Sequence, residues 1–338
     1  MTSFVSVEAF EAALADLREP DTGAAANARL RQAELTKPAG SLGRLEDLAI
    51  FFAGWQGRAR PRIERARAAI FAGNHGVTVH GVSAFPPNVT AQMVANFASG
   101  GAAINALSEA AGLELAIVAL DLDRPTADFT VAPAMREDEC LDALNRGAAA
   151  VEPDLDLLVL GEMGIGNSTA AAALCARSFA GEVAGWAGPG TGVDGHGVAR
   201  KIQVIESALA FHAEAPRSAF ETLRRVGGRE IVAIAGAIVR ARQLGVPVLL
   251  DGFICTSAIA PLAAENPAIV NHCIAGHCSS EPGHKRLLAL LGLDPLLSLD
   301  MRLGEGSGAA VAANIVRSAL AAHDRMATFA EAAVSASL

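Results

Sequence analysis

Short apolar segments alternate with longer helix-like segments along most of the chain after Pro61. The apolar segments end in glycine or in polar residues and span residues 68–76, 113–123, 155–164, 247–252, 268–277 and 296–306. The helix-like segments between them include residues 88–97, 168–181 and 229–245. Such alternation is typical of βαβ units. It predicts an α/β fold in which a mainly parallel sheet carries helices on both faces.

The two ends of the chain and the last apolar segment depart from this pattern. Residues 1–60 favour helices, and a final helix is predicted from about Ser307. In the segment 296–306, polar residues separate the apolar residues Leu297, Leu299, Met301 and Leu303. This period of two predicts a strand with one face toward solvent or toward a second domain.

Polar or glycine-rich residues follow nearly every predicted strand. They read GNHG, GEMGIGN, DGF, GHCSSE and GEGSG in chain order. Ligands of parallel α/β sheets bind beyond the carboxyl ends of the strands. We therefore expect the functional site at the edge where these segments meet.

Composition excludes several classes of function. The net charge is −9, no run of Lys or Arg is present, Tyr is absent and aromatic residues make up 4% of the chain. A nucleic-acid groove needs a basic stripe or stacking rings, so neither kind of nucleic-acid site is expected. No apolar stretch reaches the length of a membrane span, and the N-terminal segment does not resemble a secretory signal. Five cysteines without a CxxC pair favour a reduced, cytoplasmic protein.

Two glycine-rich loops could hold an anion. The first, GEMGIGN, leads into a helix for which Asn167 or Ser168 is the expected N-cap, and backbone N–H groups there could converge on a phosphate. An ordinary strand-to-helix turn would look the same. The second loop, residues 188–201, carries Arg200 and Lys201, and it is either a phosphate-closing loop or a mobile surface loop. Its GTGVDG is only a weak dinucleotide fingerprint, because no clear strand precedes it and no ribose-binding acid follows.

Histidines and cysteines gather in NHCIAGHC, residues 271–278. Their spacing matches no structural zinc pattern, and on a strand His272 and Cys273 would point to opposite faces. We predict no metal site and interpret these residues as a buried thiol and hydrogen-bonded histidines. His75 follows a strand beside Asn74, and it is either a site-lining or a structural residue.

Three carboxylates lie at predicted strand ends, namely Glu162, Asp251 and Glu305. Carboxylates gathered at one sheet edge are typical of general-base chemistry or of stabilising a cationic sugar. The structural alternative for each is capping of a helix N-terminus.

Taken together, several motifs resemble one family, the nicotinate-nucleotide–dimethylbenzimidazole phosphoribosyltransferases of cobamide lower-ligand assembly. The resembling stretches cover most of the chain in order, at residues 36–46, 73–94, 161–169, 188–194, 251–253, 276–284 and 302–310. KPAG stands here where KPPG is usual, and GNHG replaces the commoner DHG form, so Asn74 has no acidic role.

The resemblance implies a fold and a reaction. The implied fold is a Rossmann-like α/β catalytic domain over residues 61–306, with a small, mostly helical domain from residues 1–60 and about 307–338, in a homodimer. The implied pentosyltransferase joins 5,6-dimethylbenzimidazole to nicotinate mononucleotide. It releases nicotinate and inverts the ribose anomeric carbon from β to α. It needs no metal and no organic cofactor.

The resemblance also implies roles for individual residues. Glu305 is the expected base that takes the proton of the benzimidazole, and Glu162 is the expected second acid near the ribose. The residues implied around the nucleotide and its phosphate are Gly164, Ile165, Gly166, Asn167, Gly190, Gly192, Lys201, Asp251 and Ser279. The residues implied around the base are Phe85, Met93, Met163 and Leu303.

Some alternatives stay open at this level. Polar residues occupy the Phe85 and Met93 positions in some family members, so the more apolar pocket here leaves the preferred base undecided between benzimidazoles, purines and phenols. A dehydrogenase that uses GTGVDG and a non-catalytic binding protein for a ribazole-type ligand are the rival functions. A sensor has no need of a base, so Glu162 and Glu305 argue against the second rival.

Overall fold

The computed structural model describes residues 4–179 and 181–335. Its strands are β1 (Ala66–Ala72), β2 (Glu114–Ala119), β3 (Leu157–Met163), β4 (Val248–Leu250) and β5 (Cys273–Ala275). They form one sheet in the order β2-β1-β3-β4-β5, and every pairing is parallel. The predicted parallel α/β fold is confirmed. The strand order changes direction between β1 and β3, which places a ligand-binding crevice at their carboxyl ends.

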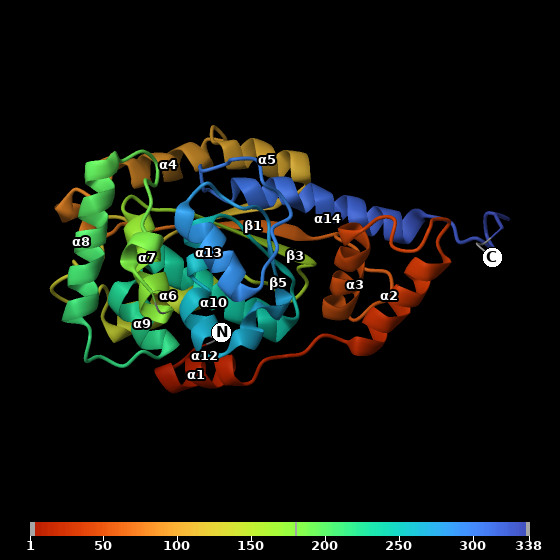
Figure 1. Ribbon diagram of the computed structural model, residues 1–338, viewed down its shortest axis with the longest axis horizontal. Helices are drawn as coiled ribbons and strands as arrows, with labels where there is room; N and C mark the ends of the chain where they lie inside the picture. Colours follow the sequence, from red (N-terminus) through yellow and green to blue (C-terminus); the bar gives the residue numbers. More distant parts are fainter. Residues whose placement is uncertain (1–3, 180, 336–338) are drawn as a thin grey trace.

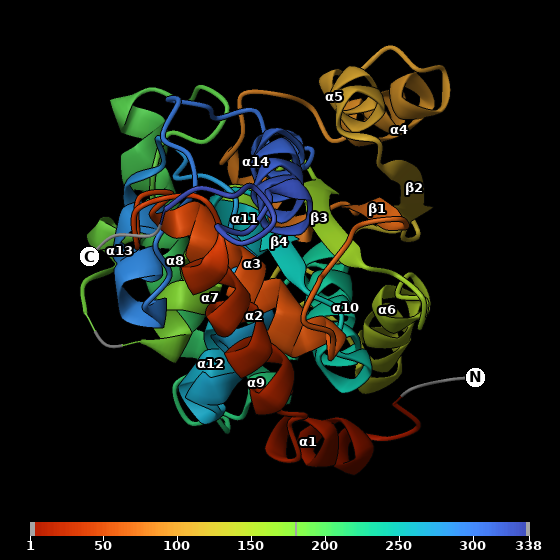
Figure 2. The same cartoon turned by 90° about the vertical axis from the view of Figure 1, so that its right-hand side faces the viewer.

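Helices cover both faces of the sheet, so the strands are mostly apolar rather than alternating. In β1, Ala69 and Phe71 belong to one buried cluster, and Ala68 and Ile70 belong to the other. Helices α6 (Glu137–Ala149) and α10 (Arg229–Leu244) pack on the first face. Helices α3 (Arg44–Gln56), α5 (Ala103–Ala111) and α14 (Ser307–Arg325) pack on the second face. Figure 2 shows these two helical layers on either side of the strands.

The remaining helices surround this framework. They are α1 (Val7–Ala15), α2 (Thr22–Glu34), η1 (Gly76–His80), α4 (Val89–Ala98), α7 (Asn167–Ser178), η2 (Val183–Gly185), α8 (Gly195–Phe211), α9 (Ala219–Val226), α11 (Phe253–Ser257), α12 (Ala260–Glu265), η3 (Pro267–His272) and α13 (Pro282–Leu291). Within the described residues, no helix combines the length and the apolar character that crossing a bilayer requires.

The N-terminal helices α2 and α3 contact the C-terminal helix α14. The predicted start of α14 at Ser307 is confirmed. Figure 1 shows α14 running from beside α5 to α3 and α2. The Arg31 guanidinium in α2 donates to the carbonyls of His323 and Asp324 at distances of 2.8 and 2.9 Å, which satisfies carbonyls that the end of α14 leaves free. Helix α1 instead packs against α9 and α10 (Figure 1). The domain boundaries given above stay a prediction.

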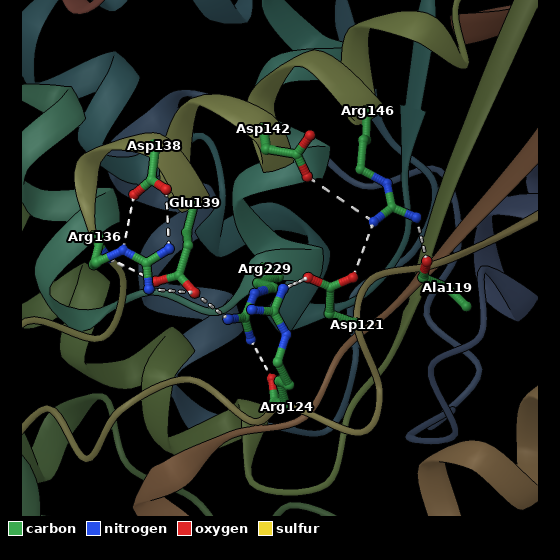
Figure 3. A network of polar contacts seen from close by, with 9 residues as sticks. All are labelled: Ala119, Asp121, Arg124, Arg136, Asp138, Glu139, Asp142, Arg146 and Arg229. Atoms are coloured by element: carbon green, nitrogen blue, oxygen red, sulfur yellow. Dashed lines mark hydrogen bonds and ion pairs between the residues drawn. The ribbon is translucent and has the colours of Figure 1, made fainter.

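Arginines fix the amino ends of α6 and α10 and the loop after β2 (Figure 3). The Arg229 guanidinium lies 2.9 Å from the Glu139 carboxylate, and it also donates to the carbonyl of Arg124. Arg136 pairs with Asp138 at 2.9 Å. Because Arg229 is the first residue of α10, these contacts also fix the position of the next residue, Glu230.

Two predicted strands are wrong in whole or in part. Residues 296–306 form no strand; Leu297 makes a single parallel bridge with His277, and Asp300 then adopts a left-handed φ of 54° that interrupts the extended backbone. The segment 268–277 begins as the helix η3, because the Asn266 side chain caps it and Pro267 opens it. Only Cys273–Ala275 of that segment pairs with the sheet.

Candidate active site

A cleft opens at the carboxyl edge of the sheet, where ligands were expected. It holds about 790 Å³ of empty space, counted to its open mouth. Its wall contains residues 82–84, 162–168, 189–191, 252–254 and 302–304, together with Val193, Lys201, His277, Ser279 and Glu281. These segments follow β1, β3, β4 and β5 or lie in loops that cross their ends. A cleft at the carboxyl ends of parallel strands is the expected position for a ligand.

The structure brings most of the predicted site residues to this cleft. Its wall contains Glu162, Met163, Gly164, Ile165, Gly166, Asn167, Gly190, Lys201, Ser279 and Leu303. The predicted residues outside the wall are Phe85, Met93, Gly192, Asp251 and Glu305. Phe85 is 48% exposed, and Met93 packs against the apolar cluster of the second sheet face.

Glu162 is a buried carboxylate in the floor of the cleft. The Asn167 amide donates to it from the start of α7. Burial, and the nearby carboxylates of Glu230 and Asp251, raise the pKa of Glu162 to about 8. A Cβ atom at position 304 would lie 2.6 Å from the Glu162 carboxylate, so only glycine fits there.

Replacing Glu162 by Gln should make the empty protein more stable at high pH. A carboxyl whose folded pKa is raised holds a proton that the unfolded chain loses, so stability falls as pH rises from about 4.5 to about 8. Gln carries no charge and escapes this loss. We expect Glu162→Gln to match the wild type near about pH 4.5 and to exceed its unfolding free energy by at least ~2 kcal/mol at about pH 8. Urea unfolding at both pH values measures the difference, and parallel pH curves for the two proteins would contradict it.

Glu305 lies immediately behind the wall of the cleft, in a backbone conformation that is unusual for its type. Gly304, Glu305 and Gly306 have φ values of 85°, 63° and 81°. A left-handed Glu costs about 1–2 kcal/mol, and such strain collects at functional sites. A Cβ atom at position 161 would lie 2.6 Å from the Gly306 nitrogen, so glycine in β3 lets this turn pack directly on the strand.

The Glu305 side chain is 5% exposed, and its Oε2 has no hydrogen-bond partner among the described residues. Burial raises the pKa of Glu305, while a backbone hydrogen bond from Ile104 opposes that rise. A buried carboxylate oxygen without a partner is costly. This oxygen is therefore available to accept a proton from a ligand that reaches past Gly304.

Asp251 caps the N-terminus of a helix, which is the structural alternative that the sequence analysis gave for each of the three carboxylates. Its carboxylate accepts from the backbone of Gly306 at 3.2 Å and of Ala309 at 3.0 Å. It thereby binds the N-terminus of α14, where negative charge is favourable. His277, which lines the cleft, also lies 3.3 Å from it. Asp251 holds the Glu305 turn in place from below.

The cationic end of the cleft is the part of its wall around Lys201. Lys201 is 2% exposed, and its ammonium donates to the Ser168 hydroxyl at 2.9 Å and to the Gly188 carbonyl at 3.1 Å. Burial lowers the pKa of Lys201. Helix α7 begins here, and its N-cap is Gly166 at φ 95°; the expected cap at Asn167 or Ser168 is wrong, because the Asn167 amide turns to Glu162. A buried ammonium beside a helix N-terminus is suited to an anion.

Sequence reasoning missed three polar residues at or behind the cleft, namely His284, Thr256 and Glu281. Ser279 donates its backbone N–H to His284 Nδ1 at 2.9 Å, so the neutral ring carries its proton on Nε2, 3.1 Å from the Thr256 hydroxyl. Burial lowers the pKa of His284 to about 3, which keeps this ring neutral. The motif GHCSSEPGH contains both His284 and the cleft residue Glu281, so it was the sequence signal for these two residues.

His75 is structural in position rather than lining the cleft. Its Nε2 lies 2.6 Å from the Glu230 carboxylate, and both side chains are fully buried. A Cβ atom at position 164 would lie 2.9 Å from Glu230, so this pair packs directly behind the glycine turn of the first loop. In the segment 271–278, the His272 ring nitrogens lie 2.9 and 3.0 Å from the backbone carbonyls of Ile269 and Ile238.

Known proteins match the chain along nearly its whole length. A sequence model of a family described as Phosphoribosyltransferase matches residues 17–334. The nicotinate-nucleotide–dimethylbenzimidazole phosphoribosyltransferase of Novosphingobium aromaticivorans is 69% identical over 335 residues, and the match covers 99% of both chains. The protein of the same name from Ruegeria pomeroyi is 60% identical over 316 residues, which are 94% of both chains. The crystal structure of CobT from Thermus thermophilus has a TM-score of 0.87 and 40% identity, covering 93% of this chain and 100% of that one. The chain belongs to the nicotinate-nucleotide–dimethylbenzimidazole phosphoribosyltransferase family.

Proposed function

We propose that this enzyme moves the 5-phosphoribosyl group of nicotinate mononucleotide to 5,6-dimethylbenzimidazole or a similar base. The products are α-ribazole 5′-phosphate and nicotinate, and the step belongs to cobalamin lower-ligand assembly. The observation that carries the proposal is one cleft whose wall contains a buried ammonium, Lys201, and a buried carboxylate, Glu162, in a chain 69% identical to a protein of that name.

The cationic end binds the 5′-phosphate in this proposal. Lys201, the Ser168 hydroxyl beside it and the backbone N–H groups at the start of α7 supply donors for phosphate oxygens. Gly166 lacks a side chain where the phosphate approaches the backbone, and Gly190 lies across from it, near Ser168 and Lys201. The ribose then extends toward the carboxylates.

The substrate supplies its own leaving group. The nicotinate ring nitrogen is cationic while it is bonded to ribose, so the ring departs neutral and leaves positive charge on the sugar. Glu162 in the floor of the cleft stabilises that charge once it is ionised, and the cationic ring lowers the pKa of a carboxyl beside it. Attack by the incoming base on the face opposite the leaving ring inverts the anomeric carbon from β to α.

The incoming base must lose a proton. One benzimidazole nitrogen attacks with its lone pair, and positive charge builds up on that ring until the N–H of the other nitrogen is removed. Glu305 accepts this proton in our assignment, because its Oε2 is buried and unpartnered and a raised pKa makes it a stronger base. Met163 and Leu303 supply apolar contacts for the flat ring.

The same proposal includes a cytoplasmic homodimer that needs no cofactor. All five cysteines are free, and four of them are buried, which is compatible with a reducing compartment. Exposed apolar side chains such as Val79 and Phe85 are available for a subunit contact. Sedimentation of the purified enzyme measures the subunit number.

Incubation with nicotinate mononucleotide and a panel of bases tests the proposed function. Chromatography should show nicotinate release that depends on the added base, with 5,6-dimethylbenzimidazole or a close analogue giving a new ribosylated product in equal amount. Purines and phenols in the panel define the base preference. Nicotinate release that is the same with and without any base would refute transferase activity, and tight binding of reduced nicotinamide dinucleotide would favour the dehydrogenase alternative.

A further inference from the structure

A third carboxylate, Glu281, faces the cationic end of the cleft. It precedes α13, is 7% exposed and contributes to the wall of the cleft. Its Oε2 is buried and has no hydrogen-bond partner among the described residues. A backbone hydrogen bond from Gly190 reaches the carboxylate, and a Cβ atom at position 188 would lie 2.2 Å from Oε2. The side chain is thus packed against the second glycine loop.

Glu281 does not neutralise Lys201 by direct pairing. Among the described residues, no carboxylate lies within 4.0 Å of the Lys201 ammonium, whose bonds go to a hydroxyl and a carbonyl. The attraction between the two groups nevertheless acts on both of their pKa values. Lys201 and Glu281 both line the cleft, so a group bound there can contact both residues.

The other charged groups around Glu281 are few. Lys201 faces it from α8, and Arg302 faces it from the segment before α14; both favour its ionised form. Glu162 and His277 are the remaining titratable residues of the cleft wall, and His284 lies on α13 itself. Burial outweighs the two cations and the Gly190 bond, so the pKa of Glu281 is raised above its usual value.

A phosphate dianion bound at Lys201 would repel an ionised carboxylate beside it. We propose that Glu281 takes up one proton from solvent when the 5′-phosphate binds, and that the resulting carboxylic acid donates a hydrogen bond from Oε2 to a phosphate oxygen. The carboxylate and the solvent proton become the acid, and no other bond is made or broken. This inference rests on the proposed function, since it places the nucleotide phosphate at Lys201.

Proton uptake makes nucleotide affinity depend on pH. Above the pKa of Glu281 in the free enzyme, the dissociation constant of nicotinate mononucleotide should rise by up to about tenfold for each pH unit. The other carboxyl oxygen still accepts from Gly190, so the protonated side chain keeps the loop of residues 188–194 closed on the phosphate. A neutral glutamine can supply an N–H donor in place of the acid O–H.

Calorimetric titration in buffers of different ionisation enthalpy measures the uptake directly. Compared with nicotinate riboside, which lacks the phosphate, nicotinate mononucleotide should bring about one more proton into the wild-type complex at about pH 8. In Glu281→Gln the nucleotide and the riboside should bind with the same proton change, and at about pH 8 this variant should bind the nucleotide at least as tightly as the wild type. Asp194→Asn is the matched control, because Asp194 caps α8 in the same loop outside the cleft wall, and it should keep the wild-type uptake.

The titration of the wild type does not depend on how well any variant folds. Equal proton changes for the nucleotide and the riboside in the wild type between about pH 7 and about pH 9, or the same excess uptake in the wild type and Glu281→Gln, would overturn the role of Glu281. So would nucleotide binding at about pH 8 that is tenfold weaker in Glu281→Gln than in the wild type. Base-dependent product formation is measured separately, so an active enzyme that takes up no proton rejects this inference and leaves the proposed function intact.

Discussion

Glu305→Gln is expected to lower turnover by about 10³-fold while it leaves the dissociation constant of nicotinate mononucleotide within about twofold. Glutamine has the same shape and can occupy the same left-handed position, but it cannot take the benzimidazole proton. In our proposal the nucleotide phosphate binds at Lys201 rather than at Glu305, so its affinity should not depend on this charge. Steady-state rates with saturating base, together with nucleotide titration, separate the two effects.

The matched control for that variant is Asp300→Asn. Asp300 is another acid at positive φ in the same segment, but its side chain is exposed and lies outside the cleft wall. Its turnover should stay within about twofold of the wild type. If Glu305→Gln retains the wild-type rate, the base assignment is wrong. If Asp300→Asn loses as much activity as Glu305→Gln, the loss reflects the backbone turn rather than proton transfer.

Lys201→Met should stabilise the empty protein and impair the enzyme. Lys201 is 2% exposed, and its ammonium has no carboxylate partner among the described residues, so it loses hydration on folding, whereas an apolar side chain of similar length does not. In our proposal the same ammonium is the charged donor for the 5′-phosphate, and loss of such a contact costs about 1.5–3 kcal/mol. We expect a higher melting temperature together with an increase of about 10²-fold in the KM for the nucleotide.

Thermal unfolding and initial rates of the same preparation measure both changes. Lys285→Met removes an equal charge from an exposed position on α13, and it should change neither quantity appreciably. A Lys201→Met protein with an unchanged KM would place the phosphate elsewhere. A lower melting temperature would show that the ammonium stabilises the fold through its bonds to Ser168 and Gly188.

The sheet and its ligand edge could be predicted because parallel strands buried on both faces are short apolar runs that end at glycine or a polar residue. The segment 296–306 could not, since its alternation of apolar and polar residues looks like a strand. A left-handed residue at Asp300 instead carries it across the cleft as an irregular segment. The pattern of apolar and polar residues does not determine the backbone angle of a single aspartate.

Sequence reasoning predicted which carboxylates lie at the sheet edge better than it predicted what each of them does there. Asp251 and Glu305 both follow apolar runs, yet the first caps α14, and the second has a carboxylate oxygen without a partner among the described residues. Local sequence cannot separate a capping carboxylate from a free one, because the difference lies in which backbone groups arrive from a distant segment. Glu230 was missed for the same reason: an acid in the first turn of a helix is ordinary, and its pairing with His75 is a tertiary contact.

The anomeric configuration of the product tests the central claim most directly, namely that phosphoribosyl transfer in this cleft is a single displacement in which the new base enters opposite the departing nicotinate. The proton NMR spectrum of the ribosylated product, formed from β-configured nicotinate mononucleotide and 5,6-dimethylbenzimidazole, reports that configuration. We predict the α anomer alone, in an amount equal to the nicotinate released. A β product, or a mixture of the two anomers, would contradict the mechanism.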